Sequence, residues 1–133
     1  MKFDVDKTVS YWEEGAIYDI DTAETLFQNG KYPYALFFGH LAIEKLLKAL
    51  FVKQKKQHAP FTHSLPFLAS KLKIEIPEEM KEKLAGFMRF YFEGRYPDKQ
   101  KEFYKKCTKE FAMENLNEIR DTFKWLKEKL HKR

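Results

Sequence analysis

The sequence predicts an all-α protein, an antiparallel up-and-down four-helix bundle with one additional short helix. Three observations support this fold class. Apolar residues recur at helical spacing in four long stretches, the chain has only five Gly and five Pro, and its one strand-like segment, residues 73–76, is short and isolated. We expect a single domain over residues 1–133, because 44% of the residues are hydrophobic and can form a core.

The first two long helices are predicted over residues 9–28 and about 33–57. In the first, apolar residues at steps of 4, 4, 3 and 4 share one helical face: Trp12, Ala16, Ile20, Ala23 and Phe27. Asn29 and Gly30 should end it, because Gly tolerates a left-handed backbone. The second helix has the widest apolar arc, so we expect it to be the most buried element.

The remaining helices follow after two breaks in the pattern. Ser64 should cap a short helix over residues 65–72, with Pro66 in its first turn. A third long helix opens at Pro77 and should stop near Gly94, and residues 90–106 read mainly as a loop. Thr108 is expected to cap the last helix, whose apolar residues have steps of 4, 3, 4, 3 and 4: Ala112, Leu116, Ile119, Phe123, Leu126 and Leu130.

Composition and charge narrow the classes of function. The net charge is +5, but residues 1–30 carry −5 (two basic, seven acidic), and residues 31–98 and 99–133 carry +5 each (twelve against seven, eleven against six). A basic C-terminal two-thirds of the chain suits a phosphate-bearing or acidic partner. The same lysines and glutamates are also typical of the solvent-exposed faces of helices. The single Cys107 excludes an internal disulfide framework, and no apolar stretch is long enough to span a membrane. We therefore expect a cytoplasmic protein.

A polar stripe in the second helix is the first candidate site. His40, Glu44 and Lys48 lie at successive i, i+4 positions and are bordered by Phe37, Leu41 and Phe51. The stripe is compatible with a simple Glu44–Lys48 ladder on the helix surface, with a polar seam inside a protein interface, or with a small-ligand pocket. Lys45 lies off the stripe, and its charged head is expected to reach water.

A basic aromatic stretch is the second candidate. Residues 90–106 combine one arginine with tyrosines and lysines: Arg95, Tyr91, Tyr96, Tyr104, Lys99, Lys101, Lys105 and Lys106. Because Arg can grip a phosphate with two hydrogen bonds while aromatic rings stack on bases, this combination suits a nucleotide or an RNA end. The alternative is structural: Arg95 pairs with a carboxylate near the helix end and the tyrosines pack.

Other chemistries are not supported by the pattern. The only Glu-x-x-His, Glu128 with His131, sits at the C-terminal end, so a ferritin-like dimetal site is not expected. Cys107 lies near the start of the last helix, where the helix dipole could lower its pKa, but nothing supplies a base. There is no Gly-rich phosphate loop. We predict no metal, no cofactor and no catalytic residue.

The chain resembles a HEPN domain (higher eukaryotes and prokaryotes nucleotide-binding). Four features in order carry the resemblance: "YALFFGHLAIEKLLKALFVKQ", "PFTHSLPFLASKL", "GRYPD" and a final amphipathic helix. The resemblance implies a four- or five-helix bundle, commonly a homodimer, that often partners a minimal nucleotidyltransferase, in some cases as a toxin–antitoxin pair. It also implies that polar positions of the family pattern are His40, Glu44, Lys45, Lys48, Thr62, His63, Arg95, Tyr96 and Pro97.

One departure from the family bears on catalysis. Ribonuclease members carry an Arg and a His separated by four to six residues, but here no His lies between residues 64 and 130, and ten residues separate Arg120 from His131. We therefore expect a non-catalytic binding module. One alternative is an atypical metal-independent ribonuclease, in which Arg95 pairs in space with His63 or His40. The other alternative is a purely structural dimerisation protein. The expected nucleotide- or RNA-binding residues are Arg95, Tyr96, Lys99 and His63, and the expected interface residues are Phe37, His40, Leu41, Glu44, Lys48 and Phe51.

Overall fold

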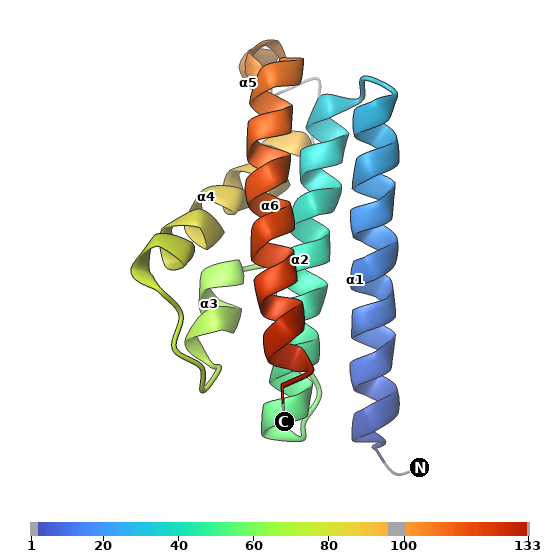
Figure 1. Ribbon diagram of the computed structural model, residues 1–133, viewed down its shortest axis with the longest axis vertical. Coiled ribbons are helices and arrows are strands. Elements are labelled where there is room, and N and C mark those ends of the chain that lie inside the picture. The colour runs from blue at the N-terminus through green and yellow to red at the C-terminus, as the bar shows by residue number, and fades with distance from the viewer. Residues whose placement is uncertain (1–2, 96–100, 133) are drawn as a thin grey trace.

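The computed structural model describes residues 3–95 and 101–132 and is all-helical within them. Six helices follow one another along the chain: α1 (Val5–Gln28), α2 (Tyr32–Lys55), α3 (Leu65–Ser70), α4 (Glu78–Gly94), α5 (Lys101–Lys106) and α6 (Lys109–Leu130). The four long helices α1, α2, α4 and α6 alternate in direction, as Figure 1 shows. The predicted all-α bundle is therefore confirmed.

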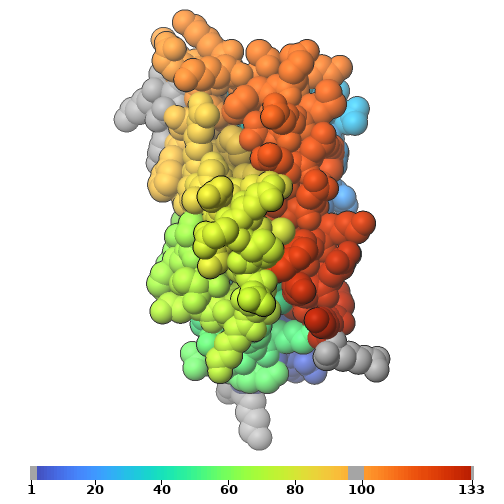
Figure 2. All heavy atoms as spheres, turned by 60° about the vertical axis from the view of Figure 1, so that its left-hand side comes forward, coloured from blue at the N-terminus to red at the C-terminus, as the bar shows by residue number. Residues whose placement is uncertain are grey.

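α2 lies at the centre of the bundle and packs against α1, α3, α4 and α6. Its apolar residues are almost completely inaccessible to solvent, and Leu36, Ile43, Leu46 and Leu47 are all 0% exposed. This burial confirms the prediction from the wide apolar arc. α3, α4 and α6 lie side by side on one face of the molecule, which Figure 2 displays as a continuous surface.

The helix ends follow the local chemistry that the sequence predicts. The side chains of Ser64 and Thr108 accept hydrogen bonds from the backbone N–H groups of Phe67 and Phe111, three residues later in each case. Gly30 has a φ of +75°, the left-handed conformation expected after α1. The N-terminus of α1 begins earlier than predicted, because Asp4 caps it by accepting from the N–H of Lys7.

The stretch predicted as a loop after α4 contains a helix that was not expected. α5 spans Lys101–Lys106 and is anchored by Phe103, which is 2% exposed and lies 6.2 Å from Phe90 between ring centroids. One buried ring in a single helical turn gives no periodicity to detect, so the interpretation of residues 101–106 as loop was wrong.

Within the described residues, no helix combines the length and hydrophobicity that a membrane crossing requires.

Gly39 allows α2 and α6 to approach closely, and replacing it should destabilise the fold. A Cβ at this position would lie 2.7 Å from Cδ1 of Ile119, a side chain that is itself 0% exposed. We expect Gly39→Ala to lower the free energy of unfolding by about 1–3 kcal/mol, measured by urea denaturation, because overpacking outweighs the gain in helix propensity.

Two further variants make that test specific. Ile119→Val removes the clashing Cδ1 atom, so the cost of Gly39→Ala should be about 1 kcal/mol smaller in that background. A Cβ on Gly86 would meet no atom within 4 Å, so Gly86→Ala should stabilise the chain by up to about 1 kcal/mol. Equal effects of the two Gly→Ala changes would contradict the close packing.

Candidate functional site

The polar stripe of α2 is buried inside the chain. His40, Glu44 and Lys48 are 0%, 4% and 6% exposed. Lys48 Nζ lies 3.1 Å from Glu44 Oε2, so the i, i+4 ion pair that the spacing predicts is formed. The ammonium group of Lys48 also lies 5.1 Å from the ring centroid of Trp12 on α1. A buried charge needs such partners, because desolvation of an unpaired ammonium or carboxylate costs several kcal/mol.

His63, in the loop between α2 and α3, completes the pairing of Glu44. Its Nδ1 lies 3.0 Å from Glu44 Oε1, so the carboxylate is shared between Lys48 and His63. Because a carboxylate only accepts, Nδ1 carries the hydrogen, and Nε2 is the acceptor of a neutral His63 ring. The main-chain carbonyl of His63 accepts a hydrogen bond of 3.1 Å from Nε2 of His40. The loop is thus held to α2 by both its side chain and its backbone.

The aromatic ring of Tyr91 on α4 joins this pair to Arg95. His63 stacks on Tyr91 at 4.6 Å between centroids, with the planes inclined by 24°. The guanidinium of Arg95 lies 4.7 Å from the centroid of the same ring and donates a hydrogen bond to the Tyr91 hydroxyl. Phe37 and His40 of α2 contact the ring as well, at 5.9 and 5.1 Å. Residues from α2, the α2–α3 loop and α4 therefore meet at Tyr91.

The candidate site is therefore the group Glu44, His63, Tyr91 and Arg95, which we call the Tyr91 cluster. The cluster is buried on one side and open on the other. Tyr91 is 9% exposed, whereas the His63 side chain is 48% exposed and Arg95 is exposed. A guanidinium and an imidazole presented together on an aromatic ring can hold a phosphate group, since both donate charge-assisted hydrogen bonds when protonated.

His40 differs from His63 in its charge. Burial lowers the pKa of His40 from 6.5 to about 4, an effect that the hydrogen bond to the His63 carbonyl only partly offsets. His40 is therefore neutral near pH 7, with its hydrogen on Nε2. Its other nitrogen, Nδ1, is 4.0 Å from Glu44 Oε1 and has no hydrogen-bond partner among the described residues. His40 thus acts as a neutral donor to the loop.

The structure brings two of the predicted binding residues together and leaves the others untested. His63 and Arg95, 32 positions apart in the sequence, both contact Tyr91. Tyr96 and Lys99 lie outside the described residues. Of the other predicted aromatic residues, Tyr104 donates a hydrogen bond of 3.2 Å to the carbonyl of Gly94. Tyr91 was predicted only as one of several tyrosines, and no signal in the sequence indicates that it links the loop to α4.

The residues predicted as an interface fall into two groups. Phe37 and Leu41 are partly exposed, whereas Phe51 is 8% exposed and the polar stripe is covered by the same chain. The burial of His40, Glu44 and Lys48 describes contacts within one chain, so their part in an interface stays a prediction.

A second buried ion pair was not predicted from the sequence. Lys45 Nζ lies 2.8 Å from Oδ2 of Asp19 on α1, and the Lys45 side chain is 31% exposed. Asp19 is 5% exposed because it follows Ala16 by three residues and precedes Ala23 by four, which places it on the buried face of α1. The expectation that the head of Lys45 simply reaches water was therefore incomplete: the ammonium group pairs with a buried carboxylate. The spacing of Asp19 could have indicated this pair.

The Cys107 thiol and a metal site are the two other kinds of reactive group considered in the sequence. Burial raises the pKa of the Cys107 thiol to about 11, and the side chain is 5% exposed. It is thus protonated at neutral pH and a poor nucleophile, which outweighs any lowering of its pKa by the helix dipole. In the part of the chain that the structure describes, no three His, Cys, Asp or Glu side chains are grouped as metal ligands.

The lowered pKa of His40 predicts a pH dependence of stability. Between pH 6.5 and about 4 the unfolded chain protonates this residue and the folded chain does not. Its contribution therefore lowers the free energy of unfolding as the pH falls through this range, by on the order of 3 kcal/mol. We expect His40→Gln, which keeps a donor for the His63 carbonyl, to flatten the pH profile of urea denaturation, whereas His58→Gln at an exposed position leaves it unchanged. Parallel profiles for the native chain and His40→Gln would rule out a buried neutral His40.

Comparisons with known proteins agree with this architecture. The chain is similar to TT1696 from Thermus thermophilus, whose crystal structure superposes with a TM-score of 0.78 at 24% identity over 91% of this chain and 97% of that one. It is also similar to ST0689, an archaeal HEPN homologue, with a TM-score of 0.72 at 24% identity over 92% and 97% of the two chains. At this level of identity the likeness concerns the fold. No curated protein matches the chain significantly.

The family of this chain follows from the match of its sequence to a protein-family model. The model of the HEPN domain matches residues 9–130, from the first helix to the last residue of α6. This chain belongs to the HEPN domain family.

Proposed function

We propose that this protein is a non-catalytic HEPN binding module that holds a nucleotide or RNA phosphate at the Tyr91 cluster and acts as the dimeric partner of a minimal nucleotidyltransferase. The observation that carries the ligand half of the proposal is the convergence of Arg95 and His63 on the ring of Tyr91. The partner half rests on membership of the HEPN family.

The electrostatics around the cluster support a phosphate ligand. Arg95 offers a planar set of donors that matches phosphate oxygens, and stacking on Tyr91 holds that plane in one orientation. Exposed lysines of α5, which are Lys101, Lys105 and Lys106, follow shortly after Arg95 in the chain and add to the positive charge of this part of the protein. Such charge attracts polyanions at long range and makes their binding salt-dependent.

A ribonuclease is the second candidate, because Glu44 positions His63 as a carboxylate positions a general base. With Nδ1–H bound to Glu44 Oε1, Nε2 of His63 is free of that hydrogen and can take the proton of a ribose 2′-hydroxyl. The 2′-oxygen would then bond to phosphorus as the bond to the 5′-oxygen breaks, the leaving oxygen taking a proton from solvent and Arg95 holding the phosphate. The missing family motif of Arg and His in close sequence makes this the weaker candidate.

Dimerisation is best supported at partly exposed apolar residues of α2 beside α4 and α5, since Phe37 contacts Tyr91 and Tyr34 contacts Tyr104. Tyr34 is 41% exposed, and Phe37 and Leu41 follow it at helical spacing with partial exposure, which gives an apolar surface beside the Tyr91 cluster. An interface centred on these residues would bring two copies of the cluster near one another. The buried stripe would support such an interface from beneath.

Ligand binding can be tested by fluorescence anisotropy with labelled single-stranded RNA and with ATP or GTP as competitors. We expect Arg95→Ala and His63→Ala to weaken RNA binding at least about tenfold, equivalent to about 1.4 kcal/mol each. Lys71→Ala, directly after α3, removes one exposed cation outside the cluster and should change binding by less than about twofold. No binding at roughly millimolar ligand, or equal binding by the Arg95 and Lys71 variants, would sink the proposal. Cleavage of the RNA in EDTA, lost in His63→Ala, would instead establish the ribonuclease.

The oligomeric state gives the second test. We expect the native chain to sediment as a dimer and Leu41→Asp to sediment as a monomer, because an interface carboxylate must be desolvated without a partner. Phe67→Asp is the control, since Phe67 on α3 is an apolar residue that is more exposed than Leu41, 43% accessible, and is not one of the proposed interface residues. A dimer that survives Leu41→Asp would move the contact to another face.

A further inference from the structure

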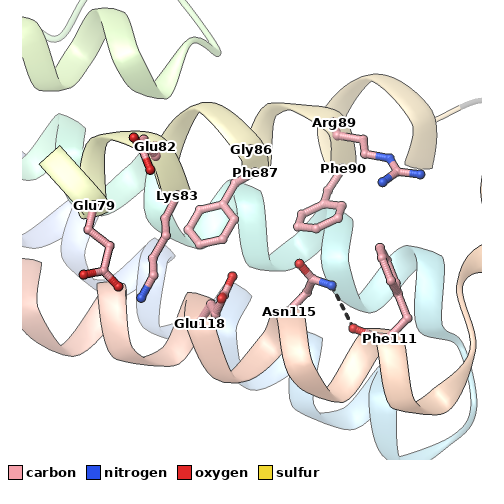
Figure 3. Close-up of a pocket in the computed structure, with 10 residues that line it drawn as sticks. All are labelled: Glu79, Glu82, Lys83, Gly86, Phe87, Arg89, Phe90, Phe111, Asn115 and Glu118. Atoms are coloured by element: carbon pink, nitrogen blue, oxygen red, sulfur yellow. Dashed lines mark hydrogen bonds between the residues drawn. The ribbon is translucent and has the colours of Figure 1, made fainter.

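A groove between α4 and α6 is not used by the Tyr91 cluster. It has a volume of about 510 Å³, and Figure 3 shows its ten lining residues. The two helices touch at one end, where the ring centroids of Phe90 and Phe111 are 6.5 Å apart. At the other end Glu79, Glu82 and Lys83 of α4 and Glu118 of α6 line the groove, and Figure 3 shows the Lys83 side chain reaching toward α6 between Glu79 and Glu118.

The floor of the groove is apolar. Phe87 and Phe90 point into the space between the helices in Figure 3 and are 2% and 3% exposed, so only the edges of their rings form the floor. Asn115, on the α6 wall, uses its amide group to donate to the carbonyl of Phe111 within its own helix. Charged side chains line the walls, namely Glu79, Glu82, Lys83, Arg89 and Glu118. An occupant therefore needs both apolar side chains for the floor and charged groups for the walls.

Gly86 lies in the wall of the groove at the middle of α4. A Cβ there would meet no atom within 4 Å, so nothing in the described chain requires glycine at this position. Glycine inside a helix is destabilising relative to alanine. A closely approaching backbone from another molecule would account for the missing side chain, because glycine allows two helices to approach more closely than any other residue.

The charged side chains at the Glu79 end of the groove indicate which kind of segment could bind there. Glu79, Glu82 and Glu118 form no ion pair within 4 Å among residues 3–95 and 101–132, and Lys83 is the one basic residue that lines the same end. This acidic end of the groove contrasts with the net charge of the whole chain, which is +5. It complements a basic segment and repels an acidic one.

We infer that this groove, which we call the Gly86 groove, binds a basic amphipathic helix of a partner protein. From Glu79 to Phe90 the groove follows twelve residues of α4, a rise of about 16 Å or three helical turns. A helix satisfies its own backbone hydrogen bonds, whereas an extended peptide would bury unpaired N–H and C=O groups against aromatic rings. Its apolar stripe would cover Phe87 and Phe90, and its Lys or Arg residues would meet the carboxylates. The inference rests on the proposed function only in assuming that the module has a protein partner.

The test uses a fluorescein-labelled, hydrocarbon-stapled helical peptide of roughly 15 residues, with a leucine stripe flanked by lysines, against the full-length protein. We expect anisotropy to give a Kd on the order of 10–100 µM for this peptide, and no binding for the same peptide with glutamates in place of the lysines. Gly86→Trp, which fills the groove, should weaken binding at least about tenfold, and Glu82→Lys combined with Glu118→Lys should do the same.

Matched controls separate the groove from general effects. Ala85→Trp places the same ring one residue away on an exposed position outside the groove, and Glu114→Lys with Glu128→Lys makes the same change of net charge elsewhere on α6. Both controls should bind the basic peptide like the native chain. The inference is overturned if the native chain does not bind the basic peptide at roughly millimolar concentration, if Gly86→Trp and Ala85→Trp bind it equally, or if the acidic peptide binds as well.

RNA binding by the same variants keeps the two proposals apart. Gly86→Trp should bind RNA like the native chain, because the groove is lined by none of the residues of the Tyr91 cluster. Loss of RNA binding in Arg95→Ala with peptide binding intact would support two separate sites. Peptide binding by a chain that binds no RNA would remove the ligand half of the proposed function and leave the groove standing.

Discussion

The enclosure of α2 by α1, α3, α4 and α6 is the constraint from which the other features follow. A helix in this position must be apolar around most of its circumference, and each polar group that it carries must find a partner inside the protein. Glu44 meets this condition with two partners, the ammonium of Lys48 and the imidazole of His63. The position of the α2–α3 loop is therefore a consequence of burying a carboxylate in the central helix.

The same contacts that stabilise the bundle also assemble the candidate site. His63 is oriented by Glu44, stacks on Tyr91 and thereby comes close to Arg95, which the end of α4 supplies. The residues of the candidate site are therefore also residues that hold the helices and the α2–α3 loop together. Glu44 is the clearest example, because its carboxylate is buried with the core and at the same time selects the tautomer of an exposed histidine.

Local signals in the sequence were sufficient for the four long helices and α3, but not for α5 or for the contacts between distant residues. Four apolar repeats, the caps Ser64 and Thr108 and the glycine after α1 predicted most of the bundle, because each depends on residues within one or two turns. The hydrogen bond from His63 to Glu44 spans 19 residues, and the stack on Tyr91 spans 28. Neither contact has a periodicity, so no pattern in the chain distinguishes Tyr91 from the other tyrosines. α5 was missed because one buried phenylalanine determines it.

The two hydrogen bonds that hold His63 bear on how a ligand could bind at the proposed site. Its backbone carbonyl is bound by His40, which is buried and neutral, and its imidazole is bound by Glu44. A ligand that competed for the imidazole would leave the backbone bond in place, so the ring could change rotamer without displacing the loop. Because this bond holds the main chain without a ligand, a ligand at the proposed site would pay little entropy for fixing the loop.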